Sequence, residues 1–153
     1  MVRRVRRPRD WEVLLGKLTD LESGGPFETY RDALVFAAAL AASKGKHLQF
    51  DSTSEPIDYS IFGKANDLDA LFYVLALFKE ESLEWFSDSK ADDRVTIFEE
   101  YANAGLGIIN DALQRHDGPP IVAITRLLSE GEPQEPKKGE IDLEEITEKL
   151  GLR

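Results

Sequence analysis

Residues 27–42 have the sequence FETYRDALVFAAALAA, and this stretch decides the fold class. Thr29 followed three residues later by Asp32 resembles a capping box, so a helix is predicted over residues 30–44. The positions from 34 to 42 are apolar nearly all round, which is the pattern of a helix buried on several sides. We therefore expect this alanine-rich helix to form the centre of a mainly α core.

The rest of the chain predicts a compact bundle of about five helices around that central helix. Apolar residues recur at spacings of three and four in each of the remaining segments. Asp10 and Asp67 stand where carboxylates are expected to cap two of these helices. The predicted helices begin at Asp10, Tyr30, Asp67, Arg94 and Pro119.

Gly105 and Gly107 interrupt the helix that begins near Arg94. Each interior glycine costs roughly 1 kcal/mol relative to alanine. Two of them indicate either close packing against a neighbouring backbone or a break between residues 103 and 107. Both interpretations fit the sequence.

Residues 57–61 also fit two interpretations. Ile57, Tyr59 and Ile61 alternate with polar residues, which predicts a strand in a small two-stranded ribbon within residues 47–61. A helical turn led by Pro56 fits as well, because Ile57 and Ile61 have helical spacing.

The composition is that of a globular protein of one domain. The chain has 153 residues, of which 42% are hydrophobic and 31% charged, with a formal net charge of −10. Its longest apolar run has nine residues, half of the roughly 18 needed to span a bilayer, so no membrane partner is expected. The absence of cysteine excludes disulfides and cysteine-ligated zinc and fits a reducing compartment. We expect a cytoplasmic protein.

Four segments are predicted along the chain. Residues 1–9 form a basic N-terminal arm, and residues 10–130 form the single helical domain. Residues 131–140 (GEPQEPKKGE) have the composition of a linker. Residues 141–153 form a short amphipathic segment, which is too short to be stable alone and must dock on this domain or on a partner.

The N-terminal arm is the one strongly cationic segment of this acidic chain. It suggests phosphate recognition by arginine, or a solvated tail that pairs with the acidic body of the same protein. Lys44 and Lys46 form a second basic cluster, which complements a helix dipole or, with Arg31, adds to a phosphate-binding surface. The arginines of the arm are Arg3, Arg4, Arg6, Arg7 and Arg9.

The sequence contains no recognisable catalytic motif. Gly63-Lys64-Ala65 lacks the first glycine and the hydroxyl residue of a phosphate loop, and the two histidines have no metal-ligand spacing. No catalytic residue, metal ligand or cofactor is therefore predicted. An oxygen-liganded cation site is an alternative interpretation of the acidic residues near the start of the fourth helix, which otherwise suit a helix N-terminus. They are Asp88, Asp92, Asp93, Glu99 and Glu100.

Four blocks of the sequence, taken in order, resemble a known family. They are RRVRRPRD (3–10), FETYRDALVFAAALAA (27–42), EPIDYSIF (55–62) and FEEYANAGLGII (98–109). Together they are similar to the small DNA phosphorothioation-associated proteins, the type-four accessory proteins of Dnd systems, over roughly residues 3–130. The resemblance implies a prokaryotic protein encoded beside machinery that puts sulfur into the DNA backbone or restricts DNA lacking it, which is a restriction-modification and phage-defence role. It supplies no catalytic residues.

Three functional hypotheses follow. The first is a non-enzymatic accessory protein that binds DNA through its arginine arm. The second is a protein adaptor or homo-oligomeric scaffold for other proteins of the same system. The third is a metal-dependent nuclease built on the acidic residues.

Overall fold

The computed structural model describes residues 2–63, 67–130 and 150–151. These residues confirm the mainly α prediction, with six α-helices and one small sheet. The predicted linker 131–140 and most of the segment 141–153 lie outside the described residues. The helices are α1 (Glu12–Leu18), α2 (Tyr30–Ser43), α3 (Ser60–Gly63), α4 (Ala70–Glu80), α5 (Ala91–Arg115) and α6 (Pro120–Glu130), and the strands are β1 (Val5–Pro8) and β2 (Thr53–Ile57).

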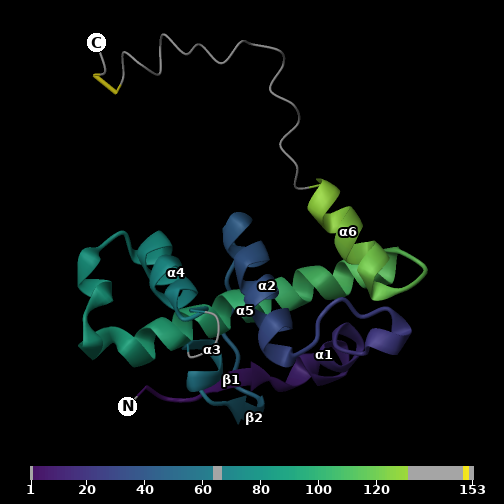
Figure 1. Ribbon diagram of the computed structural model, residues 1–153, viewed down its shortest axis with the longest axis horizontal. Coiled ribbons are helices and arrows are strands. Elements are labelled where there is room, and N and C mark those ends of the chain that lie inside the picture. Colours follow the sequence, from purple (N-terminus) through teal and green to yellow (C-terminus); the bar gives the residue numbers. More distant parts are fainter. Residues whose placement is uncertain (1, 64–66, 131–149, 152–153) are drawn as a thin grey trace.

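The long helix α5 is the element around which the others are arranged (Figure 1). It contacts α2, α4, α6 and β1. The alanine-rich α2, which the sequence predicted to be the central helix, crosses α5 and forms the largest helix–helix contact of the domain, whereas the central position belongs to α5. In the part of the chain that the structure describes, no helix is both long and apolar enough to cross a bilayer.

The crossing of α2 and α5 depends on small residues. Thr29 caps α2 as predicted, because its hydroxyl oxygen accepts a hydrogen bond from the Asp32 N–H at 3.2 Å. Ala37 is fully buried at the crossing, where a Cβ atom added to Gly105 would overlap the Ala37 carbonyl group. Helix α5 runs unbroken past both glycines, so a break between residues 103 and 107 is the wrong interpretation, and close packing against a neighbouring backbone is correct for Gly105.

Two predicted helix caps are absent. The chain enters α1 through a 3-10 turn at Arg9–Trp11, so the Glu12 N–H bonds to the Arg9 carbonyl and the Asp10 carboxylate caps nothing. At the start of α4, the Ala70 N–H bonds to the Asp67 carbonyl at 3.1 Å, and the backbone of Asp67 lies in the left-handed region, with φ 51°. Local backbone turns replace the side-chain caps at both positions.

The small sheet joins two distant segments of the chain. Strands β1 and β2 are antiparallel, and Val5 faces Ile57 across them. Both interpretations of residues 57–61 were partly right, because β2 ends at Ile57 and α3 follows. The partner of β2, however, comes from the arginine segment and not from residues 47–61. Val5 is fully buried, so residues 5–8 are part of the fold and are not a solvated tail.

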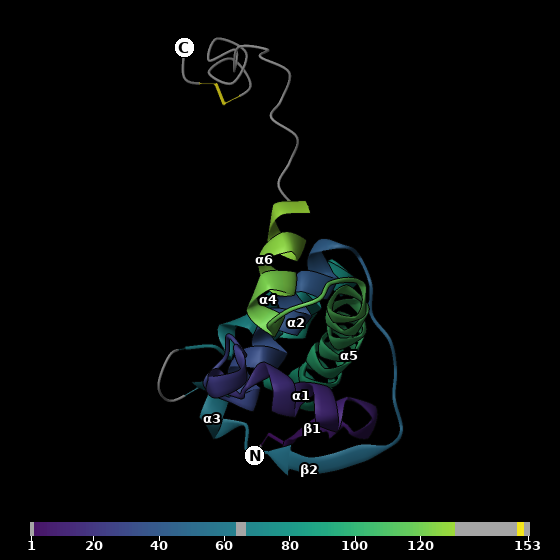
Figure 2. The ribbon, with the colours of Figure 1, turned by 90° about the vertical axis from the view of Figure 1, so that its right-hand side faces the viewer.

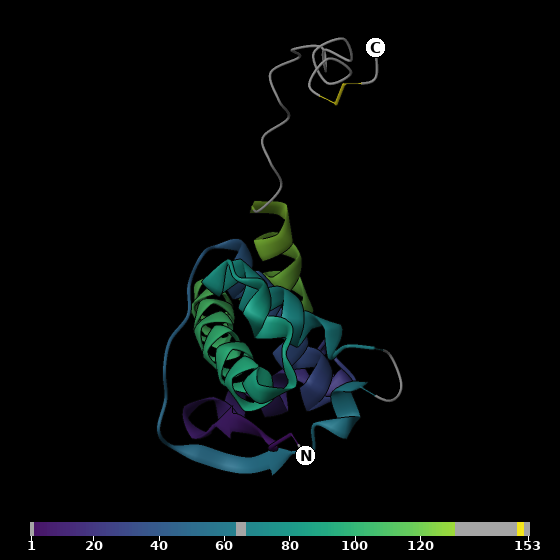
Figure 3. The same ribbon diagram turned by 90° about the vertical axis from the view of Figure 1, so that its left-hand side faces the viewer.

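The segment between α2 and β2 passes along the outer side of α5, as Figures 2 and 3 show from opposite directions. Asn103 of α5 fastens this segment, since its side-chain amide donates to the Leu48 carbonyl at 3.0 Å. The oxygen of the same Asn103 side-chain amide accepts a hydrogen bond from the Trp11 indole N–H at 2.8 Å. One buried side chain of α5 therefore ties the entry to α1 and the path to β2 together.

Candidate functional site

Two arginines of the N-terminal segment, Arg3 and Arg6, converge on one buried carboxylate. Glu99 of α5 has a side chain that is 0% exposed, and it accepts hydrogen bonds from Arg3 through both oxygens, at 2.9 and 2.7 Å. The Arg6 guanidinium reaches the same carboxylate at 3.0 Å. A buried carboxylate is costly unless it is paired and fully hydrogen-bonded, and these two arginines meet that requirement.

Further polar contacts hold Arg3 in place. Its backbone N–H donates to Asp92 at 2.9 Å, and its guanidinium donates to the Thr96 hydroxyl at 2.7 Å. The hydrogen bond to Glu99 raises the pKa of the Arg3 guanidinium against the opposing effect of burial, so the group stays charged. The segment preceding β1 is thus fixed to the first half of α5.

The other arginines of the segment also have partners within the chain. Arg7 is buried and bonds to Glu12 at 3.0 Å. Arg4 forms an exposed pair with Asp58 at 2.8 Å, and Arg9 donates to the Thr53 carbonyl at 2.9 Å. Four of the five arginines therefore pair with carboxylates of the same protein, and the free cationic character of this segment is much smaller than its sequence suggests.

The second basic cluster lies elsewhere on the molecule. Lys44 and Lys46 line a cleft of about 600 Å³ with Ile108 and Arg115 of α5. The last α5 residue that the N-terminal arginines contact is Glu99. It lies nine residues before Ile108, which corresponds to about 14 Å along the helix.

Arg31 lies in neither group. Its guanidinium pairs with the neighbouring Asp32 at 3.2 Å and donates to the Ile61 carbonyl at 3.2 Å. The structure therefore does not bring the predicted nucleic-acid-binding residues together into one surface.

The Arg7–Glu12 pair predicts a pH dependence of folding. Hydrogen bonds from Ser54 and then Arg7 lower the pKa of the Glu12 carboxyl. Because the folded-state pKa is the lower one, this stabilisation is complete above the ordinary glutamate pKa and is lost as the pH falls through the folded value. Urea unfolding should therefore show a smaller loss of stability between pH 5 and pH 3 in Glu12→Gln than in the wild type. An equal loss of stability in both proteins would contradict the assignment of this pH dependence to Glu12.

The acidic residues of the nuclease hypothesis do not form a cluster. Asp92 accepts the Arg3 N–H, and Asp93 lies 4.0 Å from the Lys90 ammonium in the first turn of α5. Over residues 2–63 and 67–130, no group of three or more histidine, aspartate or glutamate side chains is placed to hold a metal ion.

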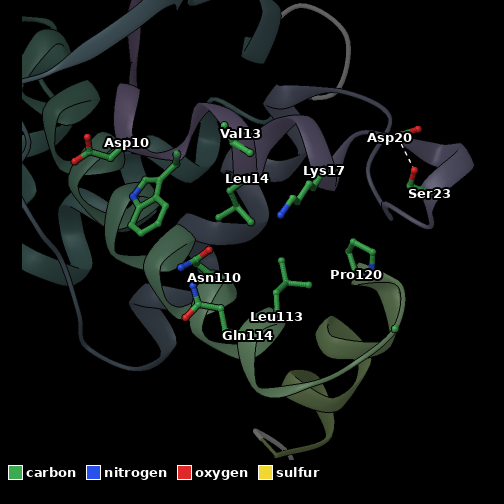
Figure 4. A pocket seen from close by; sticks show the side chains of 12 residues that line it. Asp10, Val13, Leu14, Lys17, Asp20, Ser23, Asn110, Leu113, Gln114 and Pro120 are labelled. Carbon is green, nitrogen blue, oxygen red and sulfur yellow. Dashed lines mark hydrogen bonds between the residues drawn. The ribbon is translucent and has the colours of Figure 1, made fainter.

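A shallow groove of about 520 Å³ lies between α1, α5 and the start of α6 (Figure 4). Its floor is formed by Leu14 and Leu113, and Lys17 points into it from α1. Asp20 and Ser23 at its edge bond to each other at 2.7 Å. The lining contains no histidine, and the hydrogen-bonded Asp20 and Ser23 have no third side chain in the lining that the structure shows orienting them, so the groove does not present a recognisable catalytic arrangement.

An exposed apolar surface was not anticipated from the sequence. Helix α4 buries Phe72 and Leu75, yet its opposite face leaves Val74 58% and Phe78 61% exposed. The signal was present, because Lys79 and Glu80 are the only polar side chains of α4 apart from the hydroxyl of its tyrosine. Apolar periodicity placed Phe78 with Phe72 and Leu75 on the apolar face of this helix and did not single out Val74. We call this exposed face the α4 surface, consisting of Ala70, Val74, Leu77, Phe78 and, from the adjoining turn, Leu83.

Buried Arg94 holds the turn that carries Leu83. Its guanidinium donates to the Trp85 and Ser87 carbonyls at 2.8 and 2.6 Å and lies over the Tyr73 ring at 4.1 Å. The Phe86 ring stacks on Tyr73 at 5.5 Å. The α4 surface is consequently built on a fixed support.

The described residues form a small helical protein in which four of the five N-terminal arginines pair with carboxylates of the same chain and one face of α4 exposes apolar side chains. A family model described as DNA sulphur modification system-associated protein 4 matches residues 4–146. The chain therefore belongs to this family, as the resemblance of its sequence blocks implied. No curated protein and no solved structure matches the chain.

Proposed function

We propose that this protein is a non-enzymatic accessory component that binds another protein of a DNA sulphur modification system through the α4 surface. The observation that carries the proposal is the exposure of Val74, Phe78 and Leu83, at 58%, 61% and 77%. Fully burying an exposed side chain of this kind contributes roughly 1.5–3 kcal/mol, so covering what remains exposed of these three favours association. Large exposed apolar patches on soluble proteins mark interaction sites.

The family supports a protein partner. Its description places it in association with a modification system, which implies that other proteins act at the same DNA. The internal pairing of Arg3, Arg6 and Arg7 weakens the competing idea that the N-terminal segment is a free DNA-binding arm. A protein adaptor is therefore the function that the geometry favours.

We expect the double variant Val74→Ser/Phe78→Ser to lose its complex with the partner protein. Removing two central apolar side chains from an interface should weaken binding about 100-fold. The measurement is the mass of complexes, by light scattering, after mixing with each of the other purified proteins of the system. The matched control is Val13→Ser/Leu21→Ser, which removes side chains that are 74% and 61% exposed outside the α4 surface. Unchanged complexes in the first variant would reject the proposal.

DNA binding by the N-terminal segment is the second candidate function. It is supported by the exposure of Arg4 and Arg9, whose guanidinium groups lie outside the Glu99 network. Two phosphate contacts predict a slope of about −1.8 for log affinity against log salt, whereas five would give about −4.5.

Fluorescence anisotropy with a DNA duplex at several salt concentrations measures this slope. Arg4→Gln/Arg9→Gln should abolish it, and Lys44→Gln/Lys46→Gln is the control. Point variants are preferable to deleting residues 1–9, because the deletion removes β1. A slope that Arg4→Gln/Arg9→Gln leaves unchanged would exclude the segment from DNA binding.

A further inference from the structure

We infer that the partner presents a basic amphipathic helix to the α4 surface. This inference rests on the proposed function and adds the chemistry of the partner to it. It follows from the shape of the surface, from the charges around it and from the way it is supported.

The shape of the surface suits a helix. Ala70, Val74, Leu77 and Phe78 have the spacing i, i+4, i+7 and i+8, which places them along one ridge of α4. The ridge is about 12 Å long by helical rise, and Leu83, which is 77% exposed, begins the 3-10 turn that follows the helix. Helices pack by fitting such ridges into the grooves of a partner helix, so two or three turns with apolar residues at similar spacing would cover the surface.

The charged side chains at both ends of the α4 surface are acidic. Residues 67–86 contain five acidic side chains and a single basic one, Lys79, and the Lys90 ammonium, 4.0 Å from Asp93, lies over the Trp85 ring of the adjoining turn. The Lys79 ammonium already forms ion pairs within the chain, at 3.5 Å from Glu100 and 3.9 Å from Glu80. Asp67 and Asp69 precede α4, and Glu81 and Glu84 follow it. A partner with lysine or arginine flanking its apolar stripe would therefore match this rim.

The same charges disfavour a second copy of this chain. If two α4 helices packed antiparallel, Asp69 of one copy would approach Glu81 of the other, and in a parallel arrangement identical carboxylates would meet. Like charges brought together at an interface oppose association. The acidic rim likewise repels anionic lipid and DNA.

The support of the surface makes docking possible without rearrangement. The inner face of α4 packs on α5 through Phe72, Leu75 and Ala76, all of them buried. The Arg94 hydrogen bonds to the Trp85 and Ser87 carbonyls hold the turn that carries Leu83. A preorganised surface loses little conformational entropy when a partner binds.

The test uses two synthetic, fluorescein-labelled 14-residue peptides with leucines at i, i+3, i+4 and i+7. One peptide has lysines at its flanking positions, and the other has glutamates there. We expect the full-length chain to bind the lysine peptide at least tenfold more tightly, as measured by fluorescence anisotropy. Val74→Ser/Phe78→Ser should abolish the binding, and Glu81→Lys/Glu84→Lys should reduce the preference for lysine at least fivefold. Val13→Ser/Leu21→Ser should bind as the wild type does.

Several results would overturn the inference. They are equal binding of both peptides, binding that survives Val74→Ser/Phe78→Ser, and sedimentation showing that the chain alone forms dimers that this variant abolishes. The proposed function fails separately, if no protein of the system binds through the α4 surface. If such a protein binds, but Glu81→Lys/Glu84→Lys leaves its affinity unchanged, the adaptor function stands and the basic partner is rejected. Circular dichroism of every variant confirms that the fold is retained.

Discussion

Gly105→Ala is expected to destabilise the protein by about 3 kcal/mol, the upper part of the range for overpacking a core. A methyl group at this position would overlap the carbonyl group of Ala37, which belongs to the backbone of α2. No rotamer change can relieve a clash with backbone, so α2 and α5 must move apart along their buried contact. Thermal unfolding followed by circular dichroism should show a midpoint lower by roughly 10 °C for a chain of this size.

Gly107→Ala is the matched control, two residues further along α5. Its new methyl group would meet only the Trp11 ring, at the ordinary contact distance of 3.6 Å. Since alanine favours a helix over glycine by roughly 1 kcal/mol, this variant should be as stable as the wild type or slightly more stable. Equal losses of stability in the two variants would show that the crossing with α2 is not what requires glycine at position 105.

Glu99→Gln is expected to destabilise the protein by about 3 kcal/mol, because it leaves Arg3 and Arg6 facing a neutral amide. The glutamine amide keeps the shape of the carboxylate. Its two N–H donors, however, would face the guanidinium N–H donors of Arg3 and Arg6. The estimate is at the low end for a broken buried pair, since the Arg3 and Arg6 side chains are 30% and 40% exposed. Urea unfolding measures the change. Increased proteolysis before β1 should accompany it.

The control for Glu99→Gln is Asp58→Asn, which removes the carboxylate partner of Arg4 at the surface. Both side chains of that pair are about 60% exposed, and exposed pairs contribute at most about 1 kcal/mol. A loss in Glu99→Gln no larger than that of the control would mean that the buried network does not stabilise the N-terminal segment.

The elements that sequence predicted well are those whose signals are local. The Thr29–Asp32 pair starts α2, and apolar spacing marks α2, α5 and α6, because both signals act within one or two helical turns. The caps expected from Asp10 and Asp67 were wrong for a related reason. A short backbone turn can satisfy the first N–H groups of a helix as well as a carboxylate does, and composition does not distinguish the two.

The structural role of the N-terminal arginines could not be predicted from the sequence around them. Pairing with the acidic body of the protein was one of the two interpretations of the arginine run, but the sequence did not indicate the carboxylate that Arg3 and Arg6 bind, Glu99, which lies more than 90 residues away. In the sequence Phe98-Glu99-Glu100, nothing distinguishes the buried carboxylate from an ordinary solvent-facing one. Pairing across such a separation is a tertiary property, as is the pairing of β1 with β2.

The α4 surface was missed although its residues gave a strong local apolar signal. A helix that is apolar on all sides does not reveal which side the domain covers. Phe72 and Phe78 have the same residue type in the same helix, and only the position of α5 separates the buried one from the exposed one.

The pairing of β1 with β2 and α5 has a consequence for the order in which the protein matures on the ribosome. β1 is synthesised first, but its hydrogen-bonding partner follows about 50 residues later and Glu99 later still. Contacts between segments so distant in the chain form slowly. During translation Arg3 and Arg6 therefore remain without their carboxylate partner until the long helix has emerged, whereas Arg7 can pair with Glu12 as soon as both have been synthesised.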